Sequence, residues 1–473
     1  MKRITILIIV GLFLLQMACQ TLTAPRHTPT PYPAVLASPQ VTVTASPPTP
    51  TPVPFPTPLD IAGPACFGSF GYGVTCLQDN EWINYTRENS SLSGDQIVDM
   101  TVCPGGEILV LHTQGTDLFD GVLWRHYGQG WGYGSPAAIA CAASNDFWVA
   151  HFQGVTHFDG QSWKTYPVKE TLTHDPEAHG QLKDIAVAPD GAIWAVTNNS
   201  LAVFTNGEWQ VYEKGAGFSE RYFFENIAFD AQGHPRVTSS RGLFTYDGPF
   251  WNLYTYQDLT SPQGLTVDKQ NRVWAGTFNS GLLVFENGSW LKYTAQNSAL
   301  ASENVRVLTT DTQGRVWVGT TWGLYVVEGK NWTSYHISNS DLADDAITAI
   351  AVVGRGPTLP PAQHKAPGAL TGKLIAADGA PLANVPIEVC VETLYSSYLG
   401  VTPCEGHSYV RDAVSGADGA FTIEKLPTGF YNLAIQNGET WMLYSSRSRG
   451  SSERFLVPSG ETKDLGEIIV GGE

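Results

Sequence analysis

Large aromatic and cationic side chains recur in the segments that connect the short apolar runs of this chain. A flat aromatic ring can stack on a sugar or on an apolar peptide side chain, while a guanidinium or imidazole fixes orientation by hydrogen bonding. Long connections on a rigid scaffold commonly carry such binding groups. The candidate ligand-binding residues are Trp131, Tyr133, His151, Phe152, Arg221, Arg241, Phe278 and Trp322.

Motifs for catalysis or metal binding are not found in the sequence. It has no GxSxG, HExxH or P-loop pattern and no GxGxxG between a strand and a helix. It has no CxxC pair that would suggest zinc. Asp-x-x-Gly turns such as 311–314 lack the alternating carboxylates that calcium requires. We therefore expect no catalytic residues, no metal site and no cofactor.

The composition limits which fold classes and which kinds of binding partner are compatible with the chain. The 48 Gly, 14 Trp and 19 Tyr residues favour an all-β fold with many tight turns. The net charge of −17 disfavours nucleic acid as a partner, because its phosphates repel an acidic chain. A Thr/Pro-rich segment over 20–60 cannot pack a core and is predicted to be an extended linker.

Residues 1–19 have the pattern of an export signal. Lys2 gives a positive start, and the apolar run over 4–15 is shorter than the about 20 residues of a membrane span. With Cys19 at its end, the segment resembles a bacterial lipoprotein signal, which implies lipidation of Cys19 and a membrane tether. Gln16 departs from that pattern, so a plain secretion signal or a retained anchor stays open. Each alternative places the protein outside the cytoplasm.

The remaining six cysteines are an even set, as expected in an oxidising compartment. Two of them flank a Gly-rich turn at positions that would face each other across a hairpin. Another two fall within the C-terminal region, and the last two lie in neighbouring predicted strands, one residue out of register. The predicted pairs are Cys66 with Cys76 and Cys390 with Cys404, and Cys103 with Cys141 is left open.

A Trp-x-x-Tyr unit recurs at intervals of roughly 40–45 residues, which is the spacing of propeller blades. Each unit reads as four short strands separated by turns. Six complete units run from Asp95 to Tyr335, and a seventh needs 66–85 together with 346–353. This predicts a seven-bladed β-propeller over 61–354, closed by both ends of the domain. The units begin at Trp82, Trp124, Trp163, Trp209, Trp251, Trp290 and Trp332.

Propeller topology predicts where each connection lies. The connections between strands 2 and 3 and between blades share one face, and the candidate binding residues fall in these connections. In strand 2 a recurring tryptophan is expected to pack between blades, while Arg236 occupies that slot in one blade and must be paired or solvated. The predicted core tryptophans are Trp148, Trp194, Trp274 and Trp317.

Several blades resemble the two-component-regulator propeller family. The matching stretches are 311–320 with Gly323-Leu324, 268–277 with Gly281-Leu282, and 190–197. The resemblance implies a ligand-binding, sensor-like propeller at the cell surface. Streptogramin lyases share a seven-bladed, Trp-rich fold with a channel histidine and a metal, so His112 or His151 would be the candidates if this chain were such an enzyme.

The C-terminal region reads as a second all-β unit. A Pro-rich hinge over 355–368 precedes 369–473, in which apolar residues alternate around a Pro-Thr-Gly turn at 427–429. This unit resembles a carboxypeptidase-regulatory-like β-sandwich. An adhesin B-type isopeptide bond would need a Glu where Ile435 stands, so the regulatory-like alternative is preferred.

These observations give one leading interpretation and two alternatives. The leading one is a surface-anchored, monomeric binding protein that recognises a glycan, peptide or protein on the loop-rich propeller face. The first alternative is an extracellular propeller enzyme of the streptogramin-lyase or polysaccharide-lyase kind, and the second is a structural envelope protein.

Overall fold

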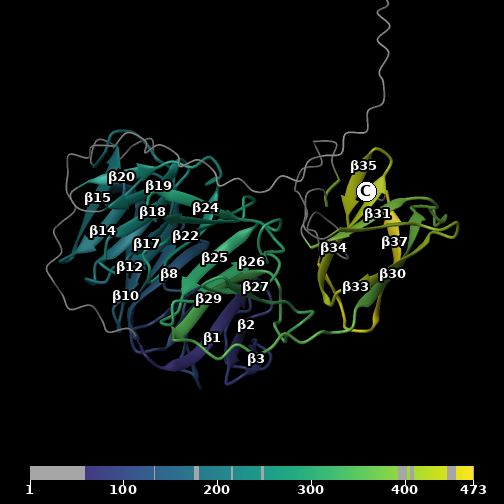
Figure 1. Ribbon diagram of the computed structural model, residues 1–473, viewed down its shortest axis with the longest axis horizontal. Helices are drawn as coiled ribbons and strands as arrows, with labels where there is room; N and C mark the ends of the chain where they lie inside the picture. The colour runs from purple at the N-terminus through teal and green to yellow at the C-terminus, as the bar shows by residue number, and fades with distance from the viewer. Residues whose placement is uncertain are drawn as a thin grey trace, which may run out of the picture. The chain divides into compact units, whose positions relative to one another are not determined.

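The described part of the chain is almost entirely β-structure (Figure 1). The computed structural model describes residues 59–132, 134–174, 180–214, 217–246, 250–391, 402–404, 410–444 and 454–471. One short π-helix, η1 (Val168–Leu172), interrupts the strands. Among the described residues, no helix has the length and apolar character needed to cross a membrane. The predicted export signal and most of the Thr/Pro-rich linker lie outside the described residues.

Six blades are sheets whose strands follow one another in the chain, and their pairing is antiparallel except for one short strand in blade 3. In blade 6, the four strands occupy 305–335 and pair in sequence order, with the innermost strand first. Strand 2 is buried throughout, whereas the outermost strand has one exposed residue, three that are partly buried and one that is buried. The blade therefore runs from a buried inner edge to a solvated outer edge, as a propeller requires.

Seven such sheets occur in the described residues 59–354, six of them continuous in sequence. Blade 3 carries a short fifth strand. The bounds of blades 1 to 3 are β4 (Ile97–Val102), β5 (Ile108–His112), β6 (Gly115–Phe119), β7 (Trp124–Gly128), β8 (Pro136–Ala143), β9 (Asp146–His151), β10 (Gly154–Phe158), β11 (Trp163–Pro167), β12 (Leu182–Val187), β13 (Ile193–Thr197), β14 (Leu201–Thr205), β15 (Glu208–Lys214) and β16 (Gly217–Phe218).

Blades 4 to 6 repeat the four-strand pattern without additions. Their bounds are β17 (Phe224–Phe229), β18 (Pro235–Ser239), β19 (Gly242–Tyr246), β20 (Trp251–Tyr254), β21 (Pro262–Val267), β22 (Val273–Thr277), β23 (Leu282–Glu286), β24 (Ser289–Tyr293), β25 (Val305–Thr310), β26 (Val316–Thr320), β27 (Leu324–Glu328) and β28 (Asn331–Tyr335).

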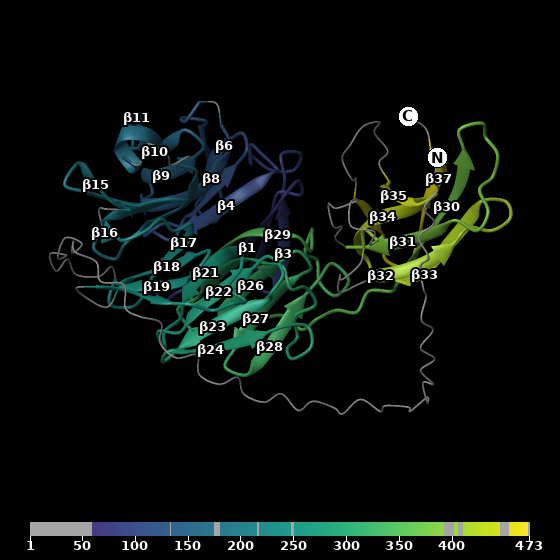
Figure 2. The same ribbon diagram turned by 90° about the horizontal axis from the view of Figure 1, so that it is seen from above.

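Blade 7 is built from both ends of the propeller, as the sequence predicted. Its inner strand β29 (Ile347–Gly354) pairs with β1 (Ala62–Ser69), which is followed by β2 (Val74–Gln78) and β3 (Glu81–Tyr85). Figure 2 shows β29 beside β1. Strand β29 also lies against β25 of blade 6 and β4 of blade 1, so the ring of inner strands closes.

The recurring strand-2 tryptophans form the core between blades, which confirms their predicted role. Trp274 and Trp317 have exposed fractions of 1% and 0%. In blade 6, the Asp311 carboxylate accepts hydrogen bonds from Arg315 Nε at 2.6 Å and from Trp317 Nε1 at 3.0 Å. This triad ties the turn between strands 1 and 2 to the tryptophan that packs against the neighbouring blade.

Arg236 takes the place of that tryptophan in blade 4 and makes the same connection. Its Nη2 donates to Asp230 Oδ2 at 2.7 Å, and both residues are buried. The guanidinium N–H thus replaces the indole N–H as donor to the turn carboxylate. The buried charge of Arg236, which was predicted to need a partner, is thus paired with Asp230, and Arg236 has a structural role.

Three disulfides join the six cysteines of the described region. Cys66 and Cys76 face each other across the β1–β2 hairpin, as predicted. Cys103 and Cys141 are also bonded and link blade 1 to blade 2. The third bond, between Cys390 and Cys404, lies in the C-terminal unit, again as predicted.

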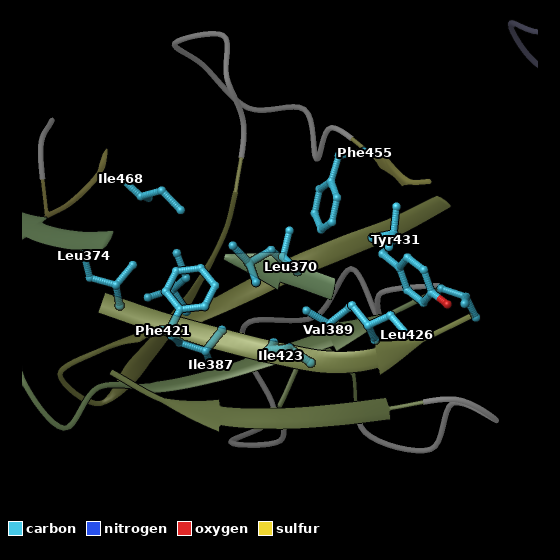
Figure 3. Close-up of a cluster of buried hydrophobic side chains, with 14 of the residues drawn as sticks. Leu370, Leu374, Ile387, Val389, Phe421, Ile423, Leu426, Tyr431, Phe455 and Ile468 are labelled. Carbon is cyan, nitrogen blue, oxygen red and sulfur yellow. The ribbon is translucent and has the colours of Figure 1, made fainter. Parts of the chain in front are cut away.

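The C-terminal unit has two sheets with one shared apolar core. Figure 3 shows side chains of both sheets gathered in that core, among them Leu370, Val389 and Phe421. Ile435, the residue found where an isopeptide-forming domain would need Glu, is fully buried there. The strands are β30 (Gly368–Ala376), β33 (Ala420–Leu426) and β37 (Thr462–Val470) in one sheet, and β31 (Pro386–Cys390), β32 (Val410–Val414), β34 (Gly429–Asn437), β35 (Thr440–Leu443) and β36 (Phe455–Val457) in the other.

Candidate functional site

The turns between strands 2 and 3 lie beside the starts of the inner strands. The first residue of the turn donates its N–H to the carbonyl just before the inner strand of the same blade. Phe152 N bonds Ser135 O at 3.1 Å, and Phe278 N bonds Ser261 O at 3.2 Å. These turns therefore surround the end of the channel at which the inner strands begin, which we call the channel mouth. The same bond is made by Thr113, Asn198, Ser240 and Thr321.

A register shift near the start of each inner strand shapes this mouth. In blade 4, for example, Phe224 pairs with Ser239 but Ile227 pairs with Val237, so one residue is left over. Such bulges bend a strand and re-aim its side chains. The residues at and beside the bulges line a cavity of about 540 Å³. The lining residues are Lys183, Glu225, Asn226, Ser261, Pro262, Gln263, Arg306 and Thr348.

The mouth has a polar arc and an apolar arc. Blades 3 to 7 contribute charged, amide and hydroxyl groups, whereas the second inner-strand residues of blades 1 and 2 are Val98 and Ala137. Lys183 Nζ lies 3.0 Å from Glu225 Oε2, which joins blades 3 and 4. Thr348 Oγ1 donates to Ile97 O at 2.8 Å, which joins blades 7 and 1. The cavity thus offers hydrogen-bond donors and acceptors from blades 3 to 7.

Two carboxylates stand further along the same inner strands. Asp99 accepts Met100 N at 2.8 Å and, from the next blade, Ile139 N at 2.9 Å. Asp184 makes the equivalent pair of bonds, with Ile185 N and Ile227 N. Burial raises the pKa of each to about 7 although the backbone bonds oppose it, and the charge of Asp99 raises the pKa of Asp184 further.

These carboxylates should make the fold more stable in acid. Their folded-state pKa lies above the unfolded value of 3.8, so stability is full below about pH 4 and is lost as the pH rises through about 7. We expect a loss of about 2–4 kcal/mol for the pair, because both aspartates are partly accessible and solvent screens part of the effect. Thermal unfolding of wild type and Asp99→Asn/Asp184→Asn between pH 4.5 and 8 measures it. A pH dependence that the double variant keeps in full would contradict this assignment.

The structure separates the predicted binding residues into accessible and buried groups. Phe152 and Phe278 are exposed, with fractions of 70% and 46%. Arg241 is accessible but ion-paired, its Nη1 lying 2.8 Å from Glu220 Oε1. Arg221 is partly buried. Tyr133 lies outside the described residues.

Three predicted binding residues are buried instead, with exposed fractions of 3% for Trp131, 0% for His151 and 7% for Trp322. Trp131 packs in the apolar core between blades 1 and 2. His151 Nδ1 accepts Gln153 N at 3.3 Å, its Nε2 bonds Thr156 Oγ1 at 2.8 Å, and burial lowers its pKa to about 4. Trp131 and His151 are therefore structural residues of the propeller.

His151 has a structural counterpart in other blades. Where blade 2 has His151 at the end of strand 2, blades 3 and 6 have Thr197 and Thr320, whose Oγ1 atoms accept Asn199 N and Trp322 N. The imidazole Nδ1 therefore replaces a threonine hydroxyl as the acceptor that caps the turn. His112 of blade 1 does the same, accepting Gln114 N at 3.1 Å.

One group among the described residues could hold a metal ion, although the sequence suggested no such site. Asp117 and His112 are fully buried, and the side chain of His126 is 47% exposed. Burial opposes ionisation of Asp117, but hydrogen bonds from His112, Ser93 N and His126 outweigh it and lower its pKa. Cross-strand pairing brings these residues together, which no local sequence motif reveals.

Comparisons with known proteins agree with the propeller and assign no activity to this chain. The family described as "Two component regulator propeller" matches residues 299–322, and no curated protein matches the chain. The extracellular domain of a B. thetaiotaomicron protein assigned as a hybrid two-component system is 15% identical (TM-score 0.46). That match covers 62% of this chain and only 38% of that domain.

Two further solved structures show similar likeness. A virginiamycin B lyase from Staphylococcus aureus, solved with quinupristin, is 14% identical (TM-score 0.41), with 51% of this chain and 84% of that chain covered. PorZ, a surface component of the type-IX secretion system of Porphyromonas gingivalis, is also 14% identical (TM-score 0.44), with 82% and 63% covered. At these levels the likenesses assign no function to this chain.

Proposed function

We propose that this chain is an extracytoplasmic, surface-tethered binding protein that takes its ligand at the channel mouth. The observation that carries the proposal is the cavity of about 540 Å³ at the start of the inner strands. Its size falls within the usual range of small-ligand sites, about 300–1,000 Å³. The Phe152 and Phe278 rings stand exposed in the turns around the same mouth.

The chemistry of the mouth favours a ligand with many hydrogen-bonding groups. The mouth presents amide donors and acceptors from Gln263 and Asn226. It also presents one positive and one negative charge, from the Lys183–Glu225 pair. An exposed phenylalanine ring can stack on a sugar or an apolar peptide side chain. A glycan or a peptide segment matches this combination. We infer recognition without catalysis as the role of the mouth.

Several features support the location. Three disulfides are typical of a protein that matures outside the cytoplasm. The lipoprotein-like segment 1–19 favours a lipid tether at Cys19, and the Thr/Pro-rich stretch that follows would serve as a spacer. The match to a two-component-regulator propeller model over 299–322 is compatible with a sensor-like role.

Binding should depend on the mouth and not on the opposite face. Ligands for the full chain are first identified on glycan and peptide arrays, and their Kd is then measured by calorimetry. We expect Gln263→Ala combined with Phe278→Ala to weaken binding at least tenfold, which is about 1.4 kcal/mol. The matched control is Val122→Ser, because Val122 is 82% exposed in a strand 3–4 turn.

The control also defines the contrary result. Unchanged binding by the mouth variant, together with weaker binding by Val122→Ser, would move the site to the other face. Melting temperatures of both variants should stay within a few degrees of wild type, because the substituted side chains are accessible or line a cavity.

A further inference from the structure

Three polar side chains of blade 1 converge around the hydroxyl oxygen of Ser93. Ser93 Oγ lies 2.9 Å from His112 Nε2, 2.7 Å from His126 Nδ1 and 2.9 Å from both carboxylate oxygens of Asp117. His126 Nδ1 is 2.7 Å from Asp117 Oδ1. We call Ser93, His112, Asp117 and His126 the blade 1 cluster. Serine, carboxylate and imidazole within such distances form a donor set that can surround a cation.

Three neighbouring strands and one bulge hold the cluster in place. His112 ends β5, Asp117 lies in β6 and His126 in β7, directly opposite Asp117. The β6–β7 pair has a register shift, since Thr116 faces Gly128 and not Tyr127. Gly128 adopts φ +71°, which suits glycine at a bulge. No described strand 3–4 pair of another blade has this shift, so the local backbone departs from the repeat at the cluster itself.

Blade 2 supplies an internal comparison. The same positions hold His151, Thr156 and Thr165, which form a simple chain of 2.8 Å hydrogen bonds. In blade 2, threonine hydroxyls therefore meet the hydrogen-bonding needs of the buried His151 ring, and no carboxylate takes part. Among the described blades, only blade 1 has Asp and His at the paired strand 3 and strand 4 positions. Elsewhere these positions hold Thr156/Thr165, Ala202/Val211, Phe244/Leu253, Leu283/Lys292, Tyr325/Ser334 and Thr75/Asn84.

The protonation pattern separates the roles of the two histidines. Because His112 Nδ1 accepts the Gln114 N–H, its proton must sit on Nε2, which then donates toward Asp117 Oδ2 at 3.2 Å. A metal ion bound to His112 Nε2 would require the ring proton to be on Nδ1. There it would face the backbone N–H of Gln114, and neither group could accept a hydrogen bond. His112 therefore positions the carboxylate. Nδ1 of His126 faces Ser93 Oγ and Asp117 Oδ1 and no backbone N–H, and the side chain is half-exposed. The tautomer with its proton on Nε2 can therefore present Nδ1 to a cation.

We propose that Asp117 and His126, assisted by the Ser93 hydroxyl, form a binding site for a divalent transition-metal ion. One carboxylate and one imidazole suit a borderline cation such as Zn²⁺. Coordination through Nδ1 requires that His126 carry its single ring proton on Nε2. Water completes the coordination. The histidine–carboxylate hydrogen bond from His112 holds the ligand in place, a common arrangement around protein metals.

The test uses the full, tag-free chain and Zn²⁺ itself. Calorimetric titration in a non-coordinating buffer should show one site per chain, and Co²⁺ should give a visible absorption band at the same stoichiometry. We expect His126→Gln to weaken Zn²⁺ binding at least tenfold, because the amide keeps a bond to Asp117 but is a poor ligand. His157→Gln is the matched control, since His157 Nε2 lies 2.8 Å from Asp146 in an ordinary pair.

A second variant tests the division of roles. His112→Thr restores the residue type that caps this turn in other blades, so the fold should tolerate it. We expect it to weaken Zn²⁺ binding by less than His126→Gln does. An equal or greater loss would overturn the assignment of His112 as a positioning residue. Absence of saturable binding by the wild type, or equal binding by His126→Gln, would overturn the site.

Discussion

Deletion of residues 61–85 is expected to abolish the cooperative unfolding of the propeller. The deletion removes β1, β2 and β3, which pair with β29 to complete blade 7. It would leave an unpaired edge on β29 and uncover the apolar cluster around Val353 and Ile97. The ring would then lack one of its sheets. Calorimetry should show loss or broadening of the unfolding transition, and gel filtration should show aggregates.

A shorter truncation provides the control for this experiment. Removal of residues 20–57 leaves every strand in place, together with the Leu59 carbonyl that accepts Thr312 Oγ1. The melting temperature should therefore stay close to that of the full chain. If both truncated proteins unfolded with equal cooperativity, blade 7 would not be the closure of the ring.

The second large effect is expected from Asp311→Ala. The Asp311 carboxylate accepts bonds from Gln313 N, Arg315 N, Arg315 Nε and Trp317 Nε1, and its side chain is fully buried. Its removal leaves the Arg315 charge without a carboxylate partner, although Nη2 still donates to Arg355 O and Pro357 O, and only 6% of the Arg315 side chain is exposed. Loss of one partner of a buried ion pair costs about 3–5 kcal/mol. Chemical denaturation of the full chain would measure this loss.

Blade 3 offers a control in the same turn. There Ala188 occupies the position of Asp311, because its N–H bonds Ala192 O as Asp311 N bonds Arg315 O, and Asp190 stands two residues later. Asp190 is partly exposed and accepts a bond from Ala192 N at 3.0 Å, but no arginine follows it in the turn. Asp190→Ala should cost only about 0.5–1.5 kcal/mol, the ordinary value for a hydrogen bond. Similar losses at both positions would show that the arginine–tryptophan connection adds nothing.

The repeat made the propeller predictable. A Trp-x-x-Tyr unit marks each outer strand, and a missing inner strand at one end matched a spare strand at the other. Trp317 and its equivalents could be placed in the core because they recur at the same position of strand 2, and Trp274 and Trp317 each follow a turn aspartate by six residues. Cys66 and Cys76 could be paired because a hairpin fixes which residues face each other.

The candidate site was less predictable, because it depends on features that the repeat does not encode. Loop residues such as Trp131 and His151 were expected at the surface, yet neighbouring blades cover them. The mouth is lined by Lys183 and Arg306, which a bulge directs into the channel without any distinctive motif. The one available signal was a polar residue at the second position of otherwise apolar inner strands. The blade 1 cluster arises from cross-strand register, which becomes visible only with the fold.

The closure of the ring also determines how the propeller responds to mechanical force. Ala62 pairs with Gly354, so the chain enters and leaves the ring at adjacent points of one antiparallel ladder. A pull between the segments that flank the propeller would act on the same end of β1 and β29. Their hydrogen bonds would then break one after another, from Ala62 toward Ser69, in the manner of a zipper. The other six blades would carry no tension until that ladder had opened. Blade 7 would therefore be the first part of the propeller to unfold under force.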